Sequence, residues 1–231
     1  MSDLIDTTEM YLRTVYELQE EGIVPMRARI AERLGQSGPT VSQTVGRMQR
    51  DGLLVVSDDR HLEFTPAGHA AAVRVMRKHR LAECLLVQIL GLAWEEAHAE
   101  ACRWEHVISE TVEQRIVELL DHPTASPYGN PIPGLGELLP GAPSPESPHE
   151  ESVPLARAAG IEPSQVMVLR IAEPIQDDPQ AMAALRRVGG MPGATLTVQA
   201  TATGVAIASG EQAAELPFSI AAHVIVHRAA K

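Results

Sequence analysis

Proline is concentrated in one part of this chain, and that concentration limits how the 231 residues can fold. Nine of the seventeen prolines lie between Pro123 and Pro154. Proline lacks a backbone N–H and restricts the residue before it, so a long helix or a central strand cannot run through such a segment. Within it, LLPGAPSPESPHEESVP is typical of an extended linker. We therefore expect this stretch to connect separate folded units.

The chain before this segment begins with two expected helices. Residues 4 to 21 carry apolar side chains at helical spacing, and an N-cap is available at Asp6, Thr7 or Thr8. Residues 27 to 34 form a second, short helix that Gly35 would end.

A third helix and a hairpin follow. In QSGPTVSQTVGRMQRDG, Ser37 is the expected N-cap, and Pro39 stands in the first turn, where its missing N–H costs nothing. The runs LLVVSD and HLEFT then favour two short strands around a turn. Helix, helix, turn, helix and hairpin is the order of a winged helix-turn-helix.

The third helix can present a polar face to DNA. At about 100° per residue, Val41, Val45 and Met48 share one face. Gln, Thr, Ser and Arg side chains point outward and can bind base edges and phosphates. The net charge of -11 argues against a polyanionic partner, but residues 27 to 50 hold five Arg and one Glu, a local +4. A solvated helix face is the alternative; the turn, the hairpin and the Arg cluster favour DNA binding.

From Pro66 to Leu120 the spacing of apolar residues is almost wholly that of helices. We expect one long helix from Ala67 to about Gly91, a second from Trp94 to about Val107, and a third from Glu110 to Leu120. Its apolar run LLVQILGL exceeds what a small winged domain needs for its own core. A helical dimer interface explains this surplus, since proteins that bind palindromic DNA are commonly two-fold dimers.

Residues 155 to 231 change to a β pattern. Gly and Pro turns separate four short β-like runs, which predicts a small barrel; the runs are VMVLRIA, ATLTVQATA, GVAIAS and AHVIVH. The chain has no run of eighteen apolar residues and no signal-peptide pattern, so we expect no membrane association. With Cys84 and Cys102 as its only cysteines, a reduced cytoplasmic protein is expected.

The decapeptide HAEACRWEHV concentrates groups that can bind metal. On a helix with His98 at zero, Cys102 lies at about 40°, Glu105 at about -20° and His106 at about 80°. His79 and Glu83 are spaced i, i+4 on the preceding helix. Imidazole, carboxylate and thiolate together suit a divalent transition metal.

Four interpretations of this decapeptide compete: a structural zinc site, a Cys102/His106 catalytic dyad, a polar helix face with a buried Cys, and a regulatory metal site. Structural zinc usually takes more than one Cys in paired spacing, and no third group or oxyanion site supports a dyad. Two clusters on successive helices beside a DNA-binding unit favour the regulatory site. A metal-independent winged-helix regulator of a small organic ligand, and a metal-dependent enzyme, remain as rival classes.

Five stretches carry a resemblance to a known family: DTTEMYLRTVYEL, RARIAERLGQSGPTVSQTVGRMQRDGLL, VMRKHRLAE, EACRWEHV and SPYGNPIPGL. Over about residues 1 to 140 the chain resembles the diphtheria toxin repressor and iron-dependent regulator family. The resemblance implies a mainly α protein with a β-rich C-terminal domain and no enzymatic activity. The implied division is a winged helix-turn-helix domain (1–73), a helical metal-binding and dimerisation domain (74–140), a Pro-rich linker (141–154) and an SH3-like domain (155–231).

The resemblance also implies two metal sites and a DNA-binding surface. Its primary, activating site corresponds to Met10, Cys102, Glu105 and His106. Its ancillary site corresponds to His79, Glu83 and His98, completed by Glu173 and Gln176 at the family's E-x-x-Q spacing in AEPIQ. Its DNA contacts correspond to Arg27, Ala28, Ser37, Pro39, Thr40, Ser42, Gln43, Arg47 and Arg50.

The identity of the metal follows in part from the ligands. Thioether and thiol groups favour metals softer than manganese, so Fe2+ is the expected physiological ion, while Co2+, Ni2+, Mn2+ or Zn2+ could substitute in vitro. The resemblance implies a homodimer that binds a palindromic operator when iron-loaded and represses iron-uptake and siderophore genes. Whether one dimer or two occupy each operator stays open.

Overall fold

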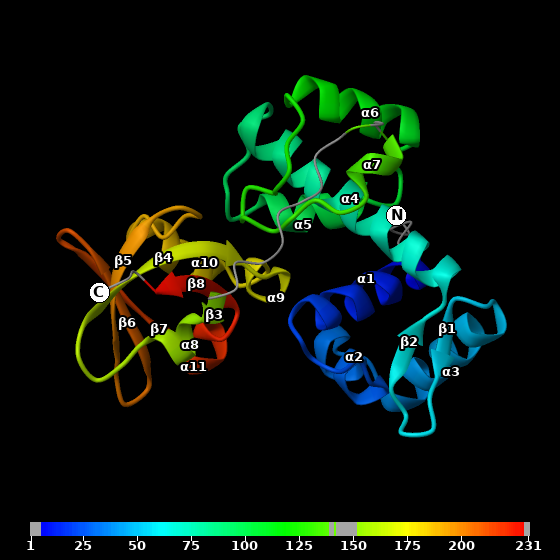
Figure 1. Cartoon of the computed structure of the whole chain (residues 1–231), viewed down its shortest axis with the longest axis horizontal. Coiled ribbons are helices and arrows are strands. Elements are labelled where there is room, and N and C mark those ends of the chain that lie inside the picture. The colour runs from blue at the N-terminus through cyan, green and yellow to red at the C-terminus, as the bar shows by residue number, and fades with distance from the viewer. Residues whose placement is uncertain (1–5, 139–140, 142–151, 229–231) are drawn as a thin grey trace.

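The computed structural model describes residues 6–138, 141 and 152–228. Its first unit confirms the expected order of three helices and an antiparallel hairpin (Figure 1). The elements are α1 (Thr7–Glu20), α2 (Arg27–Leu34), α3 (Gly38–Arg50), β1 (Leu54–Val56) and β2 (Leu62–Phe64). Residues 4 and 5 of the expected first helix lie outside the described residues.

Local sequence signals begin and end these helices as expected. Asp6 is the N-cap of α1, and its carboxylate accepts from the backbone N–H groups of Thr8 and Glu9. The Ser37 hydroxyl caps α3, and Gly35 ends α2 with a φ of 60°, where glycine carries no steric cost. On α3, the side chains of Val41, Val45 and Met48 are completely buried.

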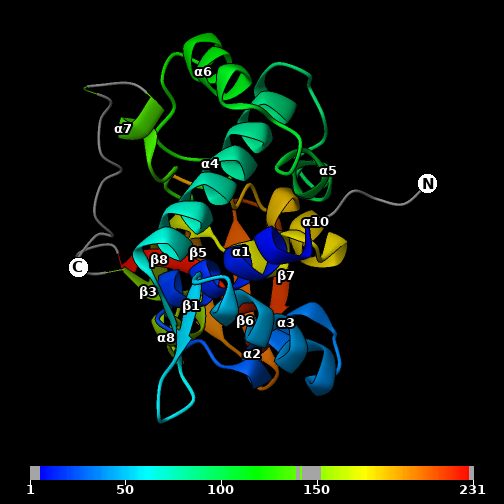
Figure 2. The ribbon, with the colours of Figure 1, turned by 90° about the vertical axis from the view of Figure 1, so that its right-hand side faces the viewer.

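The second unit is helical and is built on one long helix. Its elements are α4 (Pro66–Gln88), α5 (Ala97–Trp104), α6 (Glu110–Leu119) and α7 (Leu135–Leu138). Helix α4 starts directly after the hairpin, contacts both α1 and α5, and so belongs to both units. Figure 2 shows α4 running from the hairpin toward α6.

Helix α5 is shorter at both ends than the sequence predicts. Trp94 stacks against Tyr128, with ring centroids 5.2 Å apart, and belongs to the core of the C-terminal unit. Helix α5 begins after this contact, at Ala97. At the other end Glu105 is the C-cap, so Glu105 and His106 lie in a turn beyond α5 rather than within a helix.

The first part of the Pro-rich segment, residues 121–138, is a folded connection packed against the C-terminal unit. Tyr128 and Asn130 are fully buried. The Asn130 amide donates to the Ile171 carbonyl at 2.8 Å, and the Tyr128 hydroxyl donates to the Trp94 carbonyl at 2.6 Å. Residues 139, 140 and 142–151, which include most of the predicted linker, lie outside the described residues.

The third unit confirms the expected β-rich C-terminal domain. Six antiparallel strands lie in the order β3-β8-β4-β5-β6-β7. The strands are β3 (Ser152–Pro154), β4 (Ser164–Ile171), β5 (Thr195–Ala200), β6 (Gly204–Ser209), β7 (Gln212–Pro217) and β8 (Val224–Arg228). The helices are α8 (Leu155–Ala158), α9 (Glu173–Gln176), α10 (Pro179–Arg187) and α11 (Phe218–Ala221).

Two of these strands were not expected from the sequence. Strand β3 uses the last three residues assigned to the linker, which pair with β8. Strand β7, with the sequence QAAELP, lacks a β-branched pattern and exists through its pairing with β6. Helix α9 of this unit contacts α5, so the C-terminal unit reaches the decapeptide. Among the described residues, no helix is long and apolar enough to cross a membrane.

Candidate metal centre

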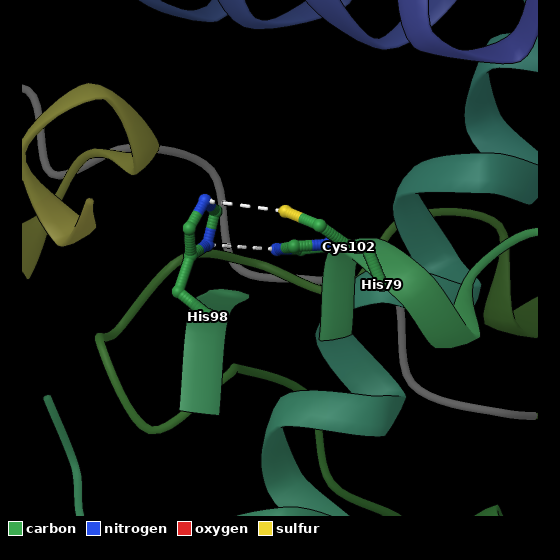
Figure 3. A group of neighbouring side chains, drawn as sticks. All are labelled: His79, His98 and Cys102. Atoms are coloured by element: carbon green, nitrogen blue, oxygen red, sulfur yellow. Dashed lines mark hydrogen bonds between the residues drawn. The ribbon is translucent and has the colours of Figure 1, made fainter. Parts of the chain in front are cut away.

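Three side chains from α4 and α5 form one compact cluster. The ligand atoms of His79, His98 and Cys102 all lie within 4.8 Å of one another. In Figure 3 the His98 ring faces both partners. Its Nδ1 is 3.1 Å from His79 Nε2, and its Nε2 is 3.6 Å from Cys102 Sγ. The i, i+4 spacing on α5 and the packing of α5 on α4 produce this histidine–cysteine cluster.

Two buried glutamates flank the histidine–cysteine cluster. Glu83 Oε1 lies 2.8 Å from His79 Nε2 and 3.1 Å from His98 Nδ1. On the other side, Glu105 Oε2 lies 2.6 Å from His79 Nδ1. His79 therefore connects Glu83, predicted for the ancillary site, with Glu105, predicted for the primary site. The two predicted ligand sets form one continuous polar interior here.

The charges in this interior support one another. Burial opposes every charged form, yet Cys102 and Glu83 together raise the pKa of His98 to about 10. Burial also opposes ionisation of Glu105, but Arg13 and His79 lower its pKa to about 2. Despite burial, Arg13 and His98 hold the pKa of Cys102 well below the usual thiol range. A thiolate is the form in which cysteine binds a metal.

Side chains of helix α1, in the first unit, contact the groups at the end of α5. Arg13 Nη1 donates to Cys102 Sγ at 3.0 Å and to Glu105 Oε2 at 2.9 Å. Glu9 Oε2 lies 2.6 Å from His106 Nδ1, and His106 Nε2 lies 3.4 Å from Glu105 Oε1. Met10 is half-buried and packs against the core of the first unit. The structure thus brings Cys102, Glu105 and His106 together under α1.

Helix α9 adds groups from the third unit. Glu173 accepts from Arg80 Nε at 2.9 Å and from Arg80 Nη2 at 2.6 Å. Gln176 donates through Nε2 to the Ile171 carbonyl at 2.7 Å. Pro174 stands in the first turn of α9, a position that needs no N–H. Glu173 and His98 line the same pocket, of about 290 Å³.

The donor set fits a divalent transition metal. It combines imidazole, carboxylate and thiolate, and the ligand atoms of the histidine–cysteine cluster are close enough to share one ion. Two buried oxygens, Glu83 Oε2 and Gln176 Oε1, have no hydrogen-bond partner among the described residues. Buried polar atoms are rarely left unpaired, and a bound cation would satisfy such oxygens.

The predicted DNA-binding residues lie on or beside two helices of the first unit, and all but Arg27 are exposed. They cover the start of α2 and the polar face of α3, opposite the buried side chains of that helix. Arg27 is half-buried; the exposed members are Ala28, Ser37, Pro39, Thr40, Ser42, Gln43, Arg47 and Arg50.

Sequence reasoning missed Glu9 and Arg13. Both lie on α1 beside the predicted ligand Met10, and their i, i+4 spacing places them on one face. That spacing was available as a signal, but its meaning depends on α1 lying against the turn after α5, which only the tertiary structure shows.

Comparison with known proteins identifies the first two units. Residues 3–62 match the family described as "Iron dependent repressor, N-terminal DNA binding domain". Residues 65–134 match "Iron dependent repressor, metal binding and dimerisation domain". The winged helix-turn-helix and the helical unit with the histidine–cysteine cluster correspond to these two descriptions.

Individual relatives extend the similarity across the chain. The iron-dependent repressor IdeR of Mycobacterium tuberculosis (strain ATCC 25618 / H37Rv) is 54% identical over 230 residues, covering 99% of this chain and 100% of the relative. The diphtheria toxin repressor of Corynebacterium efficiens is 70% identical over 138 residues, 60% of each chain.

A solved manganese-dependent transcriptional repressor in complex with manganese is 28% identical, with a TM-score of 0.78, and the match covers 96% of this chain and 100% of that one. These similarities favour a metal-dependent repressor over the small-molecule regulator considered as a rival. The chain belongs to the iron-dependent repressor family.

Proposed function

We propose that this protein is an Fe2+-dependent homodimeric repressor that binds a palindromic operator and controls iron-uptake and siderophore genes. The observation that carries the proposal is the contact of α1, from the DNA-binding unit, with the ligand groups at the end of α5. A ligand bound there contacts a sensor and a DNA-binding element at once. Such a ligand can shift the balance between two arrangements of the units.

The proposed primary site consists of Met10, Cys102, Glu105 and His106. Bound there, the metal would supply a cross-link between α1 and the turn after α5. The chain's own groups prepare the site: Glu9 orients the His106 ring, and Arg13 keeps the Cys102 sulfur ionised. Glu105 is almost fully buried, so little water would compete with a metal for its carboxylate.

The proposed ancillary site consists of His79, Glu83, His98, Glu173 and Gln176. Support comes from the unpartnered oxygens Glu83 Oε2 and Gln176 Oε1, which are the atoms such a site would use. Glu173 is already occupied by Arg80, so it would have to share its carboxylate or move. This site would link α4 and α5 to α9 of the C-terminal unit.

Iron is proposed as the physiological metal. The two curated relatives described above are named an iron-dependent repressor and a diphtheria toxin repressor, whereas the solved structure is named for manganese. The sulfur atoms of Met10 and Cys102 favour Fe2+ over the harder Mn2+. Co2+, Ni2+ or Zn2+ should also fill the site in vitro, because the affinity of such ligands for a divalent metal is set by the metal's place in the transition series. Which metal acts in the cell depends also on metal availability.

The exposed face of α2 and α3 is proposed as the DNA-binding surface. Its Gln and Arg side chains suit adenine, guanine and phosphate contacts, and the hydroxyls of Ser and Thr suit either. Two copies related by a two-fold axis would place two α3 helices in successive major grooves. The exposed apolar side chains of the helical unit, which include Ile89, Leu90 and Leu119, suit the dimer interface.

The experiment is an operator-binding measurement under anaerobic conditions. DNA selected from a random pool by the Co2+-loaded protein is titrated at fixed salt with Fe2+, with Co2+ and with chelator. Tight binding should require metal. Cys102→Ala should not bind the operator tightly even when metal is present. Cys84→Ala should keep tight, metal-dependent binding, because the Cys84 thiol is outside the histidine–cysteine cluster and donates to the Ala125 carbonyl. Equal affinity with metal and with chelator would refute the proposal.

A further inference from the structure

One nitrogen of Arg13 stands among the proposed metal ligands. Besides its hydrogen bonds to Cys102 Sγ and Glu105 Oε2, at 3.0 and 2.9 Å, Arg13 Nη1 lies 3.3 Å from His79 Nδ1. The Arg13 guanidinium is thus in contact with a sulfur, an oxygen and a nitrogen atom, each from a proposed metal ligand. The Arg13 side chain is 14% exposed, so little water screens this charge.

The same guanidinium has a second anion to pair with. Arg13 Nε lies 3.0 Å from Glu17 Oε1, one turn further along α1. Glu17 is 4% exposed and also pairs with Arg33, at 3.6 Å. Arg13 and Glu17 line the pocket of about 290 Å³ beside His98, which leaves room for the guanidinium to move. Arg13 can therefore leave Cys102 and Glu105 without losing every ionic partner.

We propose that Arg13 is an internal cation that competes with the metal for Cys102 and Glu105, and so sets the metal concentration at which the primary site fills. The inference rests on the proposed primary site. In the metal-free protein Arg13 neutralises the thiolate and carboxylate and holds α1 against the turn after α5. A metal ion has to displace it, because two cations cannot share the same thiolate and carboxylate without strong repulsion.

The direction of the effect follows from this competition. Replacing Arg13 by a neutral side chain removes a charge that repels the metal and removes hydrogen bonds that stabilise only the metal-free protein. Both changes tighten metal binding. Charge-assisted hydrogen bonds are the strong ones, and we expect a roughly tenfold or greater gain in affinity. The loss of Arg13 opposite Glu17 affects both states and does not change this direction.

The test is an anaerobic Co2+ titration of the full-length protein, followed by the thiolate-to-cobalt absorption band. Arg13→Gln should bind Co2+ roughly tenfold more tightly than the unaltered protein. The matched control is Arg33→Gln, which also removes a partner of Glu17 but makes its 2.6 Å contact with Glu21, away from the ligands. Arg33→Gln should leave the Co2+ affinity unchanged.

A second readout needs no metal titration. The melting temperature of metal-free Arg13→Gln should fall, since Cys102 and Glu105 lose their counterion, and its rise on adding Co2+ should exceed that of the unaltered protein. If Arg13→Gln does not fold without metal, Arg13→Leu takes its place; it also removes the charge, adds no metal-binding group, and should bind Co2+ more tightly than the unaltered protein does.

Unchanged or weaker Co2+ binding in the folded Arg13 variant would overturn the inference. The proposed primary site would survive that result if Cys102→Ala alone removes the cobalt–thiolate band. Absence of this band in the unaltered protein would instead overturn the primary site, and the inference with it.

Discussion

His98 shows how single residues in this interior depend on one another. It is 1% exposed, yet it lies between the Glu83 carboxylate and the Cys102 sulfur, which are negatively charged. Burial alone would drive the imidazole toward its neutral form, but these two neighbours prevail and raise its pKa to about 10. In the metal-free interior, opposite charges therefore stabilise one another. Each buried group keeps its charge because a group of opposite charge lies beside it.

This balance predicts how the stability of the metal-free protein changes with pH. The pKa of His98 is about 10 in the folded chain against an ordinary value of 6.5, so folding favours the proton. Its stabilisation is complete below about pH 6.5 and is lost as the pH rises toward about 10. We expect the free energy of unfolding to fall over that range in chelator, as measured by urea unfolding. His98→Gln should flatten the decline, whereas His69→Gln on the exposed surface should not; parallel curves would contradict the role of His98.

At the scale of elements, α4 connects the two helical units, and its start is fitted closely to the hairpin. Thr65 caps α4 by accepting from the Gly68 N–H, and its hydroxyl donates to the Gly52 carbonyl at 2.6 Å. A Cβ at Gly68 would lie 1.8 Å from the Leu53 carbonyl oxygen, a separation that real atoms do not reach. Glycine is required here by close approach of two backbones rather than by backbone torsion.

Two glycines within helices should therefore respond oppositely to alanine. Gly68→Ala forces α4 away from Leu53 and should destabilise the protein by about 3 kcal/mol. A Cβ at Gly46 of α3 meets only Arg50 Nη1, at 3.8 Å. Gly46→Ala should therefore stabilise by about 0.5–1 kcal/mol, because alanine loses less backbone entropy. Denaturant unfolding of both variants checks the pair, and equal stability changes would show that the Gly68 contact relaxes freely.

At the scale of the whole molecule, Arg80 ties the three units together. It is fully buried in α4 of the helical unit. Its guanidinium donates to Glu20 of α1 at 3.0 Å and to Glu173 of α9 at 2.9 Å. A second, exposed tether joins Arg186 of α10 to Glu95, at 2.7 Å. Buried and exposed pairs differ in energy, because removing one partner of a buried pair leaves the other charge without compensation.

Arg80→Met should destabilise the protein by about 3–5 kcal/mol, because Glu20 and Glu173 would lose their shared cation. It should also loosen the C-terminal unit, seen as faster proteolytic cleavage between the helical and β units. Arg186→Met, which breaks the exposed tether, should change the unfolding midpoint little. If the two variants behaved alike in unfolding and proteolysis, Arg80 would not be the main connection between the units.

Much of the local structure could be predicted from the sequence. Asp6 and Ser37 mark helix starts through side-chain oxygens, Gly35 marks a helix end, and the apolar spacing of α3 identifies its buried face. These signals act within a few residues and do not depend on distant parts of the chain. The same holds for the grouping of His98 with Cys102, since an i, i+4 pair on a helix shares one face.

Other features were decided by tertiary contacts. The early end of α5, the burial of Tyr128 and Asn130, and the existence of β3 and β7 each depend on partners far along the chain. The position of Arg13 among Cys102, Glu105 and His79 joins residues separated by 66 to 92 positions. The sequence by itself determined where along the chain the residue types suited to metal or DNA binding occur. Only the tertiary structure decided which charges neutralise one another, because that depends on distances of a few ångströms between separate helices.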